Sequence, residues 1–159
     1  MYSIRKEKNQ SHSQDFYVVG SMGHCSTIAN SYSLFSKKKT VCIDGDGSLL
    51  MHMGSLSCIG NNNNKNLIHI LLNNNSHESV GGQTTNSFKT NFHKIAKECN
   101  YKHIFLVDQI YQLKDILDNK EIIEDGPIFI EIKIDSGTNK ILQRPKEEFK
   151  QLKEDFINN

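Results

Sequence analysis

The sequence lacks the features that mark several large classes of protein. Its four cysteines lie far apart in a chain of 159 residues, which excludes a disulfide framework and a zinc site of paired cysteines. No apolar run approaches the ~20 residues that span a bilayer, and residues 1–14 contain no apolar stretch typical of a signal peptide. The 19 Lys and Arg are balanced by 18 Asp and Glu, which excludes the basic surface that binds nucleic acid. We therefore expect a soluble, cytoplasmic protein with neither a membrane nor a nucleic-acid partner.

The length of the chain predicts one domain with one hydrophobic core. Residues 1–14 are polar and unpatterned, so we interpret them as a flexible N-terminal arm before a domain over residues 15–159. In that domain, strand-like segments alternate with helical ones. Strands are expected over 15–20, 40–43, 67–72, 104–107 and 128–134. Helices are expected over 23–35, 48–59, from 85, over 109–120 and from 145. This alternation predicts an α/β fold, a three-layer, doubly wound parallel sheet with helices on both faces.

The same pattern predicts where several side chains lie. Gly60 is expected to end the second helix. Phe88 and Ile110 are expected on the apolar faces of the two helices that follow. In the last strand, the isoleucines share one face and Glu131 lies on the other.

Three loops are expected at the carboxyl edge of this sheet, where ligands bind in such folds. They are Gly20-Ser21-Met22-Gly23-His24, Asp44-Gly45-Asp46-Gly47-Ser48 and Asn73-Asn74-Asn75-Ser76-His77. In the second loop, glycines allow a close backbone approach, and Ser48 begins a helix whose free N–H groups favour a phosphate. Asp46 beside such a phosphate is suited to hold a hard cation.

The third loop adds oxygen ligands to this site. One helix and one strand separate it from the second loop, so Asn74 is expected to return beside Asp46 at the same sheet edge. A carboxylate, an amide oxygen and a backbone carbonyl form an oxygen-only set, which suits octahedral Mg²⁺ bound to a diphosphate.

At this point the sequence resembles a known family. The GDGS motif followed at this distance by NN resembles the pyrophosphate-binding domain of thiamine-diphosphate enzymes. The segments VGSMGH, DGDGSLLMHMGSL and NLIHILLNNNSHESVGGQTT together resemble phosphonopyruvate decarboxylases, with sulfopyruvate decarboxylase beta subunits close behind.

The resemblance implies a role for individual residues. The metal ligands would be Asp46, Asn74 and the carbonyl of Ser76, and Gly47 and Ser48 would contact the diphosphate. The backbone of Gly20 and Met22 would hydrogen-bond the cofactor's aminopyrimidine, and the Met22 side chain would be the apolar wedge that bends the cofactor. Ser21 is expected to support this loop by hydrogen bonding. His24 and His77 are the candidate catalytic residues, facing the substrate or moving protons. Asn75-Ser76 stands where the family more often has a glycine.

The implied function is the decarboxylation of a 2-oxo acid that depends on thiamine diphosphate and Mg²⁺. The first candidate substrate is phosphonopyruvate, which would give phosphonoacetaldehyde and CO₂. The alternatives are a sulfopyruvate decarboxylase beta subunit, a non-catalytic remnant that binds thiamine diphosphate, and an unrelated phosphate-binding domain. The resemblance also implies a partner, either a pyrimidine-domain (alpha) subunit or a missing N-terminal half, and an oligomer.

Overall fold

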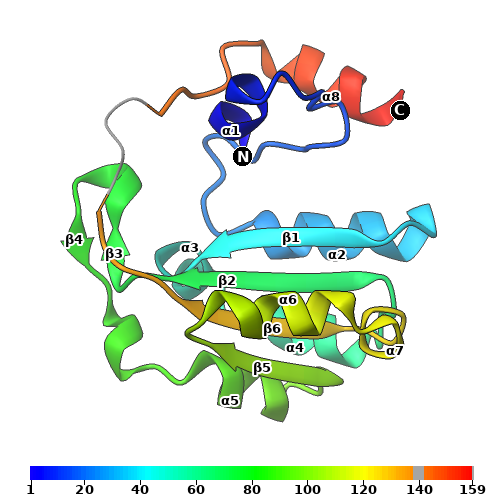
Figure 1. The fold of residues 1–159 in the computed structure, drawn as a ribbon, viewed down its shortest axis with the longest axis vertical. Coiled ribbons are helices and arrows are strands. Elements are labelled where there is room, and N and C mark those ends of the chain that lie inside the picture. The colour runs from blue at the N-terminus through cyan, green and yellow to red at the C-terminus, as the bar shows by residue number, and fades with distance from the viewer. Residues whose placement is uncertain (138–141, 159) are drawn as a thin grey trace. The chain divides into compact units, whose positions relative to one another are not determined.

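Four parallel strands form one sheet in the structure, a computed structural model that describes residues 1–137 and 142–158 (Figure 1). The chain divides into two units, which we describe separately. The sheet unit is Ser21–Gly137, and the terminal unit combines Met1–Gly20 with residues 138–159. Among the described residues, no helix combines the length and the apolar character needed to cross a membrane.

The sheet unit has the strand order β1-β2-β6-β5, with every neighbouring pair parallel. The strands of this sheet are β1 (Thr40–Gly45), β2 (Leu67–Asn73), β5 (His103–Val107) and β6 (Ile128–Lys133). A separate antiparallel hairpin, β3 (Ser76–His77) and β4 (Gln83–Thr84), follows the carboxyl end of β2. The parallel sheet confirms the predicted fold class.

Helices cover both faces of the sheet. One face carries α2 (Cys25–Ser36), α3 (Asp46–Met51), α4 (Ser55–Asn61) and α5 (Phe92–Glu98), and the other carries α6 (Ile110–Asp118) and α7 (Lys120–Ile123). Figure 1 shows α6 in front of the strands and α4 behind them. Two short 3₁₀ helices, η1 (Glu78–Val80) and η2 (Asn86–Lys89), lie between β3 and α5.

Two hydrophobic clusters account for this three-layer arrangement. The first joins Leu71 and Phe129 of the sheet to Leu49, Leu56 and other residues of α3, α4 and α5. The second joins alternate positions of the same strands to α6 and α7, and includes Ile68, Ile70, Val107, Ile128 and Ile130. Apolar burial on both faces supplies most of the free energy that holds a parallel sheet together.

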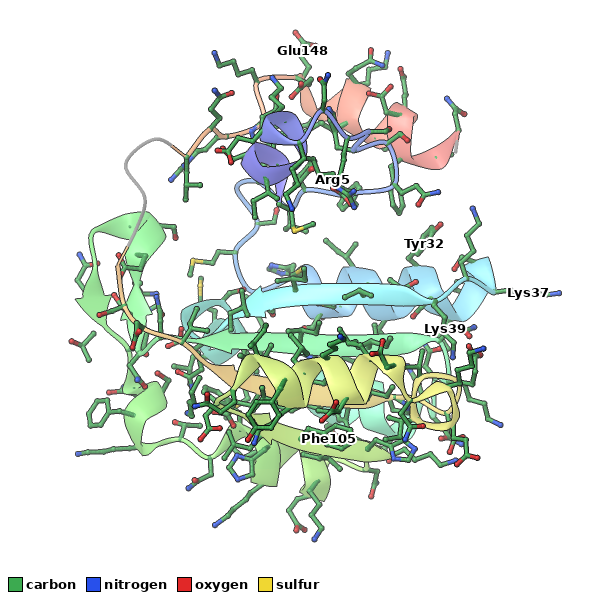
Figure 2. The ribbon with its side chains drawn as sticks, viewed as in Figure 1. Arg5, Tyr32, Lys37, Lys39, Phe105 and Glu148 are labelled. Atoms are coloured by element: carbon green, nitrogen blue, oxygen red, sulfur yellow. The ribbon has the colours of Figure 1, made fainter. Side chains whose placement is uncertain are left out.

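Local signals explain how individual helices begin and end. Lys37 follows the last residue of α2 and takes a left-handed conformation with a φ of 55°, which ends the helix (Figure 2). At the start of α6, Gln109 and Gln112 form a reciprocal capping box, which satisfies backbone N–H groups that a first turn leaves free.

The structure corrects several predicted elements. Residues 15–20 form no strand. The helix expected over 48–59 is two helices, α3 and α4, separated by residues 52–54. The helix expected from 85 is the 3₁₀ helix η2 followed by α5, and the last helix, α8 (Phe149–Ile157), begins four residues after Pro145.

Packing explains the side chains that were wrongly placed. Gly60 does not end a helix: it lies inside α4 and is buried against the backbone of Cys99. Phe88 is 58% exposed and Ile110 is 81% exposed. Phe88 lies in the short helix η2 and Ile110 is the first residue of α6, and neither belongs to the two hydrophobic clusters. Glu131 does face away from the isoleucines but is fully buried, since that face is covered as well.

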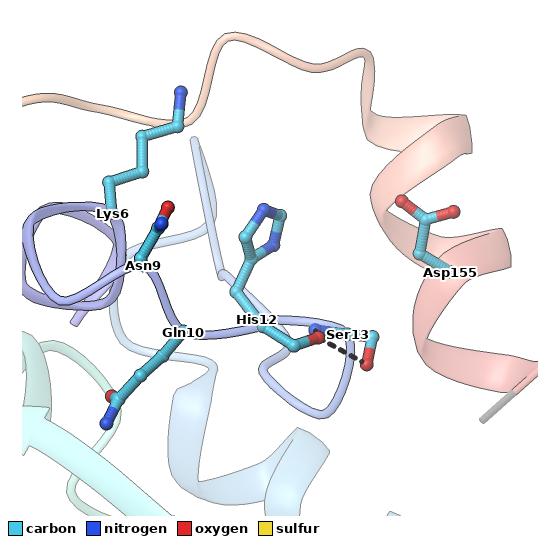
Figure 3. Close-up of a pocket in the computed structure, with 7 residues that line it drawn as sticks. Lys6, Asn9, Gln10, His12, Ser13 and Asp155 are labelled. Carbon is cyan, nitrogen blue, oxygen red and sulfur yellow. Dashed lines mark hydrogen bonds between the residues drawn. The ribbon is translucent and has the colours of Figure 1, made fainter.

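The terminal unit contains α1 (Tyr2–Glu7) and α8. The guanidinium of Arg5 donates to both carboxylate oxygens of Asp15, and Tyr2 is buried and donates to Glu147. Regular structure is therefore present within residues 1–14, while their flexibility and the domain limit at residue 15 stay predictions. A pocket of this unit is lined by polar side chains that include Lys6, Asn9, His12 and Asp155 (Figure 3), and none of its residues belongs to the predicted site.

Candidate functional site

The carboxyl ends of β1 and β2 bring two of the predicted loops together. The two strands are parallel and are paired from Thr40–Leu67 to Gly45–Leu72, so the segments that follow them leave the sheet at the same edge. Asp46 follows β1 directly and is the first residue of α3, with only 1% of its surface exposed. The loop that follows β2 leads into β3. This is the edge at which the sequence predicts a site.

Hydrogen bonds from a third segment connect Asp46 to the loop after β2. The Thr85 hydroxyl donates to Oδ2 of Asp46 at 2.5 Å, and the Thr85 N–H donates to the carbonyl of Asn75 at 3.0 Å. The Ser87 hydroxyl contacts the Thr85 hydroxyl and donates to Oδ1 of Asn75 at 2.9 Å. The predicted ligand Asp46 is thereby linked to Asn75, the residue between the other two predicted ligands, Asn74 and Ser76.

The loop itself is held in a tight turn. Oδ1 of Asn74 accepts from the N–H of Ser76 at 3.0 Å, and Asn75 has a left-handed φ of 59°. Asparagine tolerates that conformation better than most residues. Ser76 begins β3, pairs with Thr84 and is partly buried. The serine at this position is therefore compatible with an ordered turn.

Two glycines allow neighbouring loops to approach closely. A Cβ atom on Gly47 would lie 2.3 Å from Nδ1 of His77, and one on Gly23 would lie 2.5 Å from Nδ1 of His52. Gly23 also has a φ of 92°, and its N–H donates to the hydroxyl of Ser48 at 3.0 Å. Side chains larger than hydrogen would separate the loops, so these two positions bring the first and third loops against α3.

Three of the histidines lie in this region. The rings of His24 and His52 have centroids 4.3 Å apart and are tilted by 47°, and both residues are exposed. His77 packs against Gly47, and its Nδ1 is buried without a hydrogen-bond partner among residues 1–137 and 142–158. The catalytic roles of His24 and His77 stay predictions, and His52 is a neighbour of His24.

The remaining predicted contacts belong to the first loop. Ser21 is exposed and Met22 is partly buried, both at the start of the sheet unit. Gly20 is the last residue of the N-terminal stretch of the terminal unit. Their contacts with a pyrimidine ring stay predictions.

Sequence reasoning missed a buried acid at the same edge of the sheet. Glu131 accepts from Nδ2 of Asn73 at 2.9 Å, from the N–H of His93 at 3.1 Å and from Lys133 at 2.6 Å. Burial alone would raise the pKa of the Glu131 carboxyl, but its hydrogen bonds, the largest from Lys133, outweigh that effect and hold the pKa below its usual value. A charged residue in a central parallel strand was the available signal, because both faces of such a strand are buried.

A second buried cluster consists of Cys42, Asp44 and His69. Their ligand atoms lie within 4.8 Å of one another, and Oδ2 of Asp44 is 3.9 Å from Nε2 of His69. Ligand atoms on one tetrahedral zinc ion would lie about 3.3–3.8 Å apart, and the thiol of Cys42 contacts that of Cys25 instead. Burial lowers the pKa of His69 to about 4, so the ring is neutral near pH 7. We interpret the cluster as part of the core beneath the site.

Comparison with known proteins decides the family. The family profile "Thiamine pyrophosphate enzyme, C-terminal TPP binding domain" matches residues 1–132. The chain belongs to this family. We therefore interpret the site as one that binds thiamine diphosphate, the cofactor of this family.

Relatives of this TPP-binding domain carry the names of two decarboxylases. Phosphonopyruvate decarboxylase of Streptomyces viridochromogenes is 36% identical over 84% of this chain and 33% of its own length. Sulfopyruvate decarboxylase subunit beta of Methanocaldococcus jannaschii is 46% identical over 54% of this chain and 46% of its own length. The same subunit of Methanothermobacter thermautotrophicus is 30% identical over 86% of this chain and 68% of its own length. The chain thus spans about a third of the phosphonopyruvate decarboxylase and about two thirds of the last relative.

Proposed function

We propose that this TPP-binding domain holds Mg²⁺ and the diphosphate of thiamine diphosphate in an enzyme that decarboxylates a 2-oxo acid. The observation that carries the proposal is the hydrogen-bonded link between Asp46 and the Asn74–Ser76 turn. Through this link a buried carboxylate, an amide side chain and a backbone carbonyl belong to one small region at the carboxyl edge of the sheet. Oxygen donors of these kinds suit Mg²⁺, whose octahedral shell is completed by phosphate oxygens and water.

The residues of the site fit such a group. Gly47, which has no room for a side chain beside His77, carries no side chain of its own in the first turn of α3. Ser48 lies in the same turn. We assign the metal to Asp46, Asn74 and the Ser76 carbonyl, and the diphosphate to Gly47 and Ser48. When bound, thiamine diphosphate supplies the electron sink for loss of CO₂.

The histidines and the first loop complete the proposed site. Nδ1 of His77 is buried and has no partner in the described part of the chain, so a hydrogen-bonding partner from substrate or cofactor would remove a desolvation cost of about 1–3 kcal/mol. His24 is exposed beside His52, so its ring is accessible to a substrate. We propose both as catalytic residues and the Gly20-Ser21-Met22 loop as the pyrimidine contact.

Phosphonopyruvate is the substrate that we propose, with phosphonoacetaldehyde and CO₂ as products. The relative named for it is matched over 84% of this chain. Sulfopyruvate is the second candidate, because two of the relatives described above are beta subunits named for it. Both substrates would need a second domain or subunit, so we propose a pyrimidine-domain partner, an oligomeric enzyme and a cytoplasmic location.

A binding experiment tests the metal site. We expect the chain to bind thiamine diphosphate by titration calorimetry only when Mg²⁺ is present. Asp46→Asn keeps the shape of the side chain but removes its charge, so the affinity is expected to fall by at least ~10-fold. Asp118→Asn, at an exposed position on α6, is the matched control and is expected to leave binding unchanged. Equal affinity of the two variants would remove Asp46 from the site.

A second assay tests the substrate. The chain is mixed with its pyrimidine-domain partner, Mg²⁺ and thiamine diphosphate, and CO₂ release is followed with each 2-oxo acid. Release from phosphonopyruvate is the expected result. Release from sulfopyruvate alone would transfer the assignment to the second candidate, and release from neither would support a non-catalytic binding subunit.

A further inference from the structure

Thr85 holds a particular position in the hydrogen bonding of the proposed metal site. It is 3% exposed, and its hydroxyl donates to Oδ2 of Asp46 at 2.5 Å. Asp46 is itself 1% exposed, and within the described residues its side chain accepts one hydrogen bond, the one from Thr85. A buried carboxylate without a fixed donor has several rotamers of similar energy, whereas one short bond to a buried hydroxyl selects a single orientation.

The same residue also fixes the second loop of the site. Its N–H donates to the carbonyl of Asn75, and its hydroxyl contacts that of Ser87, which donates to the side chain of Asn75. Ser87 is 1% exposed, so water does not compete for these bonds. The segment Thr85–Ser87 therefore fastens both loops that carry the proposed metal ligands.

The network continues into the core and is anchored there. Oδ1 of Asn73 accepts from the N–H of Asn75 at 3.3 Å, and Nδ2 of Asn73 donates to the fully buried Glu131. A hydrogen-bonded path thus runs from β6 through the end of β2 and the Asn75 turn to Ser87, Thr85 and Asp46. Buried networks with satisfied members are rigid, because any displaced group would lose its partner in a dry environment.

We infer that Thr85 is a positioning residue for the divalent cation, holding the Asp46 carboxylate and the Asn74–Ser76 turn in their ligating arrangement before the metal binds. This inference rests on the proposed function and goes beyond it, because it concerns a residue to which the proposed function assigns no role. Partners that orient metal ligands are typically worth 10–100-fold in metal affinity. A shift of that size is expected when the Thr85 hydroxyl is removed.

The test compares variants that differ by one hydroxyl group. Thr85→Val keeps the branched shape and removes the donor, whereas Thr85→Ser keeps the donor. Thr90→Val is the matched control, since the Thr90 hydroxyl donates to a backbone carbonyl, that of Asn86, and not to Asp46. The probe is Mn²⁺ in the presence of thiamine diphosphate, with free Mn²⁺ measured by electron paramagnetic resonance.

We expect Thr85→Val to weaken Mn²⁺ binding by ~10-fold or more, Thr85→Ser to restore it to within about 3-fold, and Thr90→Val to leave it unchanged. Thr85 also caps η2 by accepting from the N–H of Ser87, so Thr85→Val is expected to lower the melting temperature as well. A purely structural role would lower the melting temperature without a matching loss of Mn²⁺ affinity in the folded protein at low temperature. That result would overturn the inference.

The outcomes separate the inference from the proposed function. If Asp46→Asn abolishes Mn²⁺ binding but Thr85→Val binds like the wild-type chain, the metal site stands and the positioning role is wrong. If the wild-type chain and Asp46→Asn bind Mn²⁺ equally, the proposed site is wrong and the inference fails with it.

Discussion

Gly60 provides a sharp test of how the helices pack on the first face of the sheet. It lies in α4 and is buried where α4 meets the end of α5. A Cβ atom on it would lie 1.7 Å from the carbonyl oxygen of Cys99, 2.7 Å from its carbonyl carbon and 3.0 Å from that of Asn100. All three obstacles are backbone atoms, so no side-chain rotation relieves the overlap. Gly60→Ala requires α4 and α5 to move apart.

The expected cost follows from two opposing effects. Overpacking of a filled core typically costs about 1–3 kcal/mol, and a backbone obstacle places this site at the upper end. Replacing glycine by alanine inside a helix returns about 1 kcal/mol through helix propensity. We therefore expect a net loss of about 2 kcal/mol in the free energy of unfolding, which corresponds to a melting temperature about 4–8 °C lower.

Gly54→Ala is the matched control for this variant. Gly54 precedes the same helix with a helical φ of −57°, is exposed, and has no atom within 4 Å of an added Cβ. Alanine there is expected to stabilise the chain by about 0.4–1 kcal/mol, because it restricts the unfolded state. Urea denaturation followed by circular dichroism measures both variants. Equal stability of Gly60→Ala and Gly54→Ala would refute the packing of α4 against α5 described above.

Two further predictions concern pH and thiol chemistry. Burial lowers the pKa of His69 to about 4 in the folded chain, below its unfolded value of about 6.5. Between pH 6.5 and 4 the unfolded chain therefore binds a proton that the folded chain does not, and the free energy of unfolding falls with pH by up to ~3 kcal/mol. Burial raises the pKa of the Asp44 carboxyl, which acts in the opposite direction, so the test compares wild type with His69→Gln. On lowering the pH from 7 to 4.5, the variant is expected to lose less free energy of unfolding than wild type. Parallel plots of the free energy of unfolding against pH would contradict this. Among the thiols, Cys58 is exposed and Cys42 is buried, and the pKa of the Cys42 thiol is raised by its hydrogen bond to Cys25 and by burial. Ellman's reagent should therefore modify Cys58 rapidly and Cys42 only after unfolding. An unchanged rapid phase in Cys58→Ser would contradict this.

Strand patterns predicted the sheet because they depend on burial alone. The segments over 40–43 and 67–72 are continuous apolar runs, and both are strands of a parallel sheet covered on two sides. The segment over 15–20 has a similar composition but belongs to the terminal unit, outside the sheet. Composition identifies a segment that is able to form a strand, whereas pairing depends on neighbours that are distant in sequence.

Helix limits were harder to predict because they depend on tertiary contacts. Apolar spacing continues from Leu49 to Ile59, and both residues are buried in one cluster, yet the helix breaks over residues 52–54. Gly60 resembles a helix end in sequence, but it is the site of closest approach between two helices. Glycine is selected in both situations by the absence of a Cβ atom, and only the neighbouring backbone distinguishes them.

The sequence also predicted which loops meet, but not what fastens them. The position of Asp46 and Asn74 after adjacent parallel strands was sufficient to predict their common edge. Thr85 stands where a helix was expected to begin, and its side chain caps η2 by accepting from the N–H of Ser87. Its second bond, to Asp46, joins residues separated by 39 positions, and no local pattern indicates such a pair.

Two buried carboxylates at this edge of the sheet differ in a way that bears on function. An ionised carboxylate has about four acceptor positions, and each one left empty in a dry environment costs free energy. Glu131 is fully buried, and Asn73, His93 and Lys133 all donate to it. Asp46 is almost as deeply buried but accepts, within the described residues, the single bond from Thr85. The protein supplies several donors to the first acid and one to the second, which is why we assign Glu131 to the framework and propose Asp46 as a metal ligand. The buried oxygen of Asp44 that has no partner among the described residues faces His69 in the core.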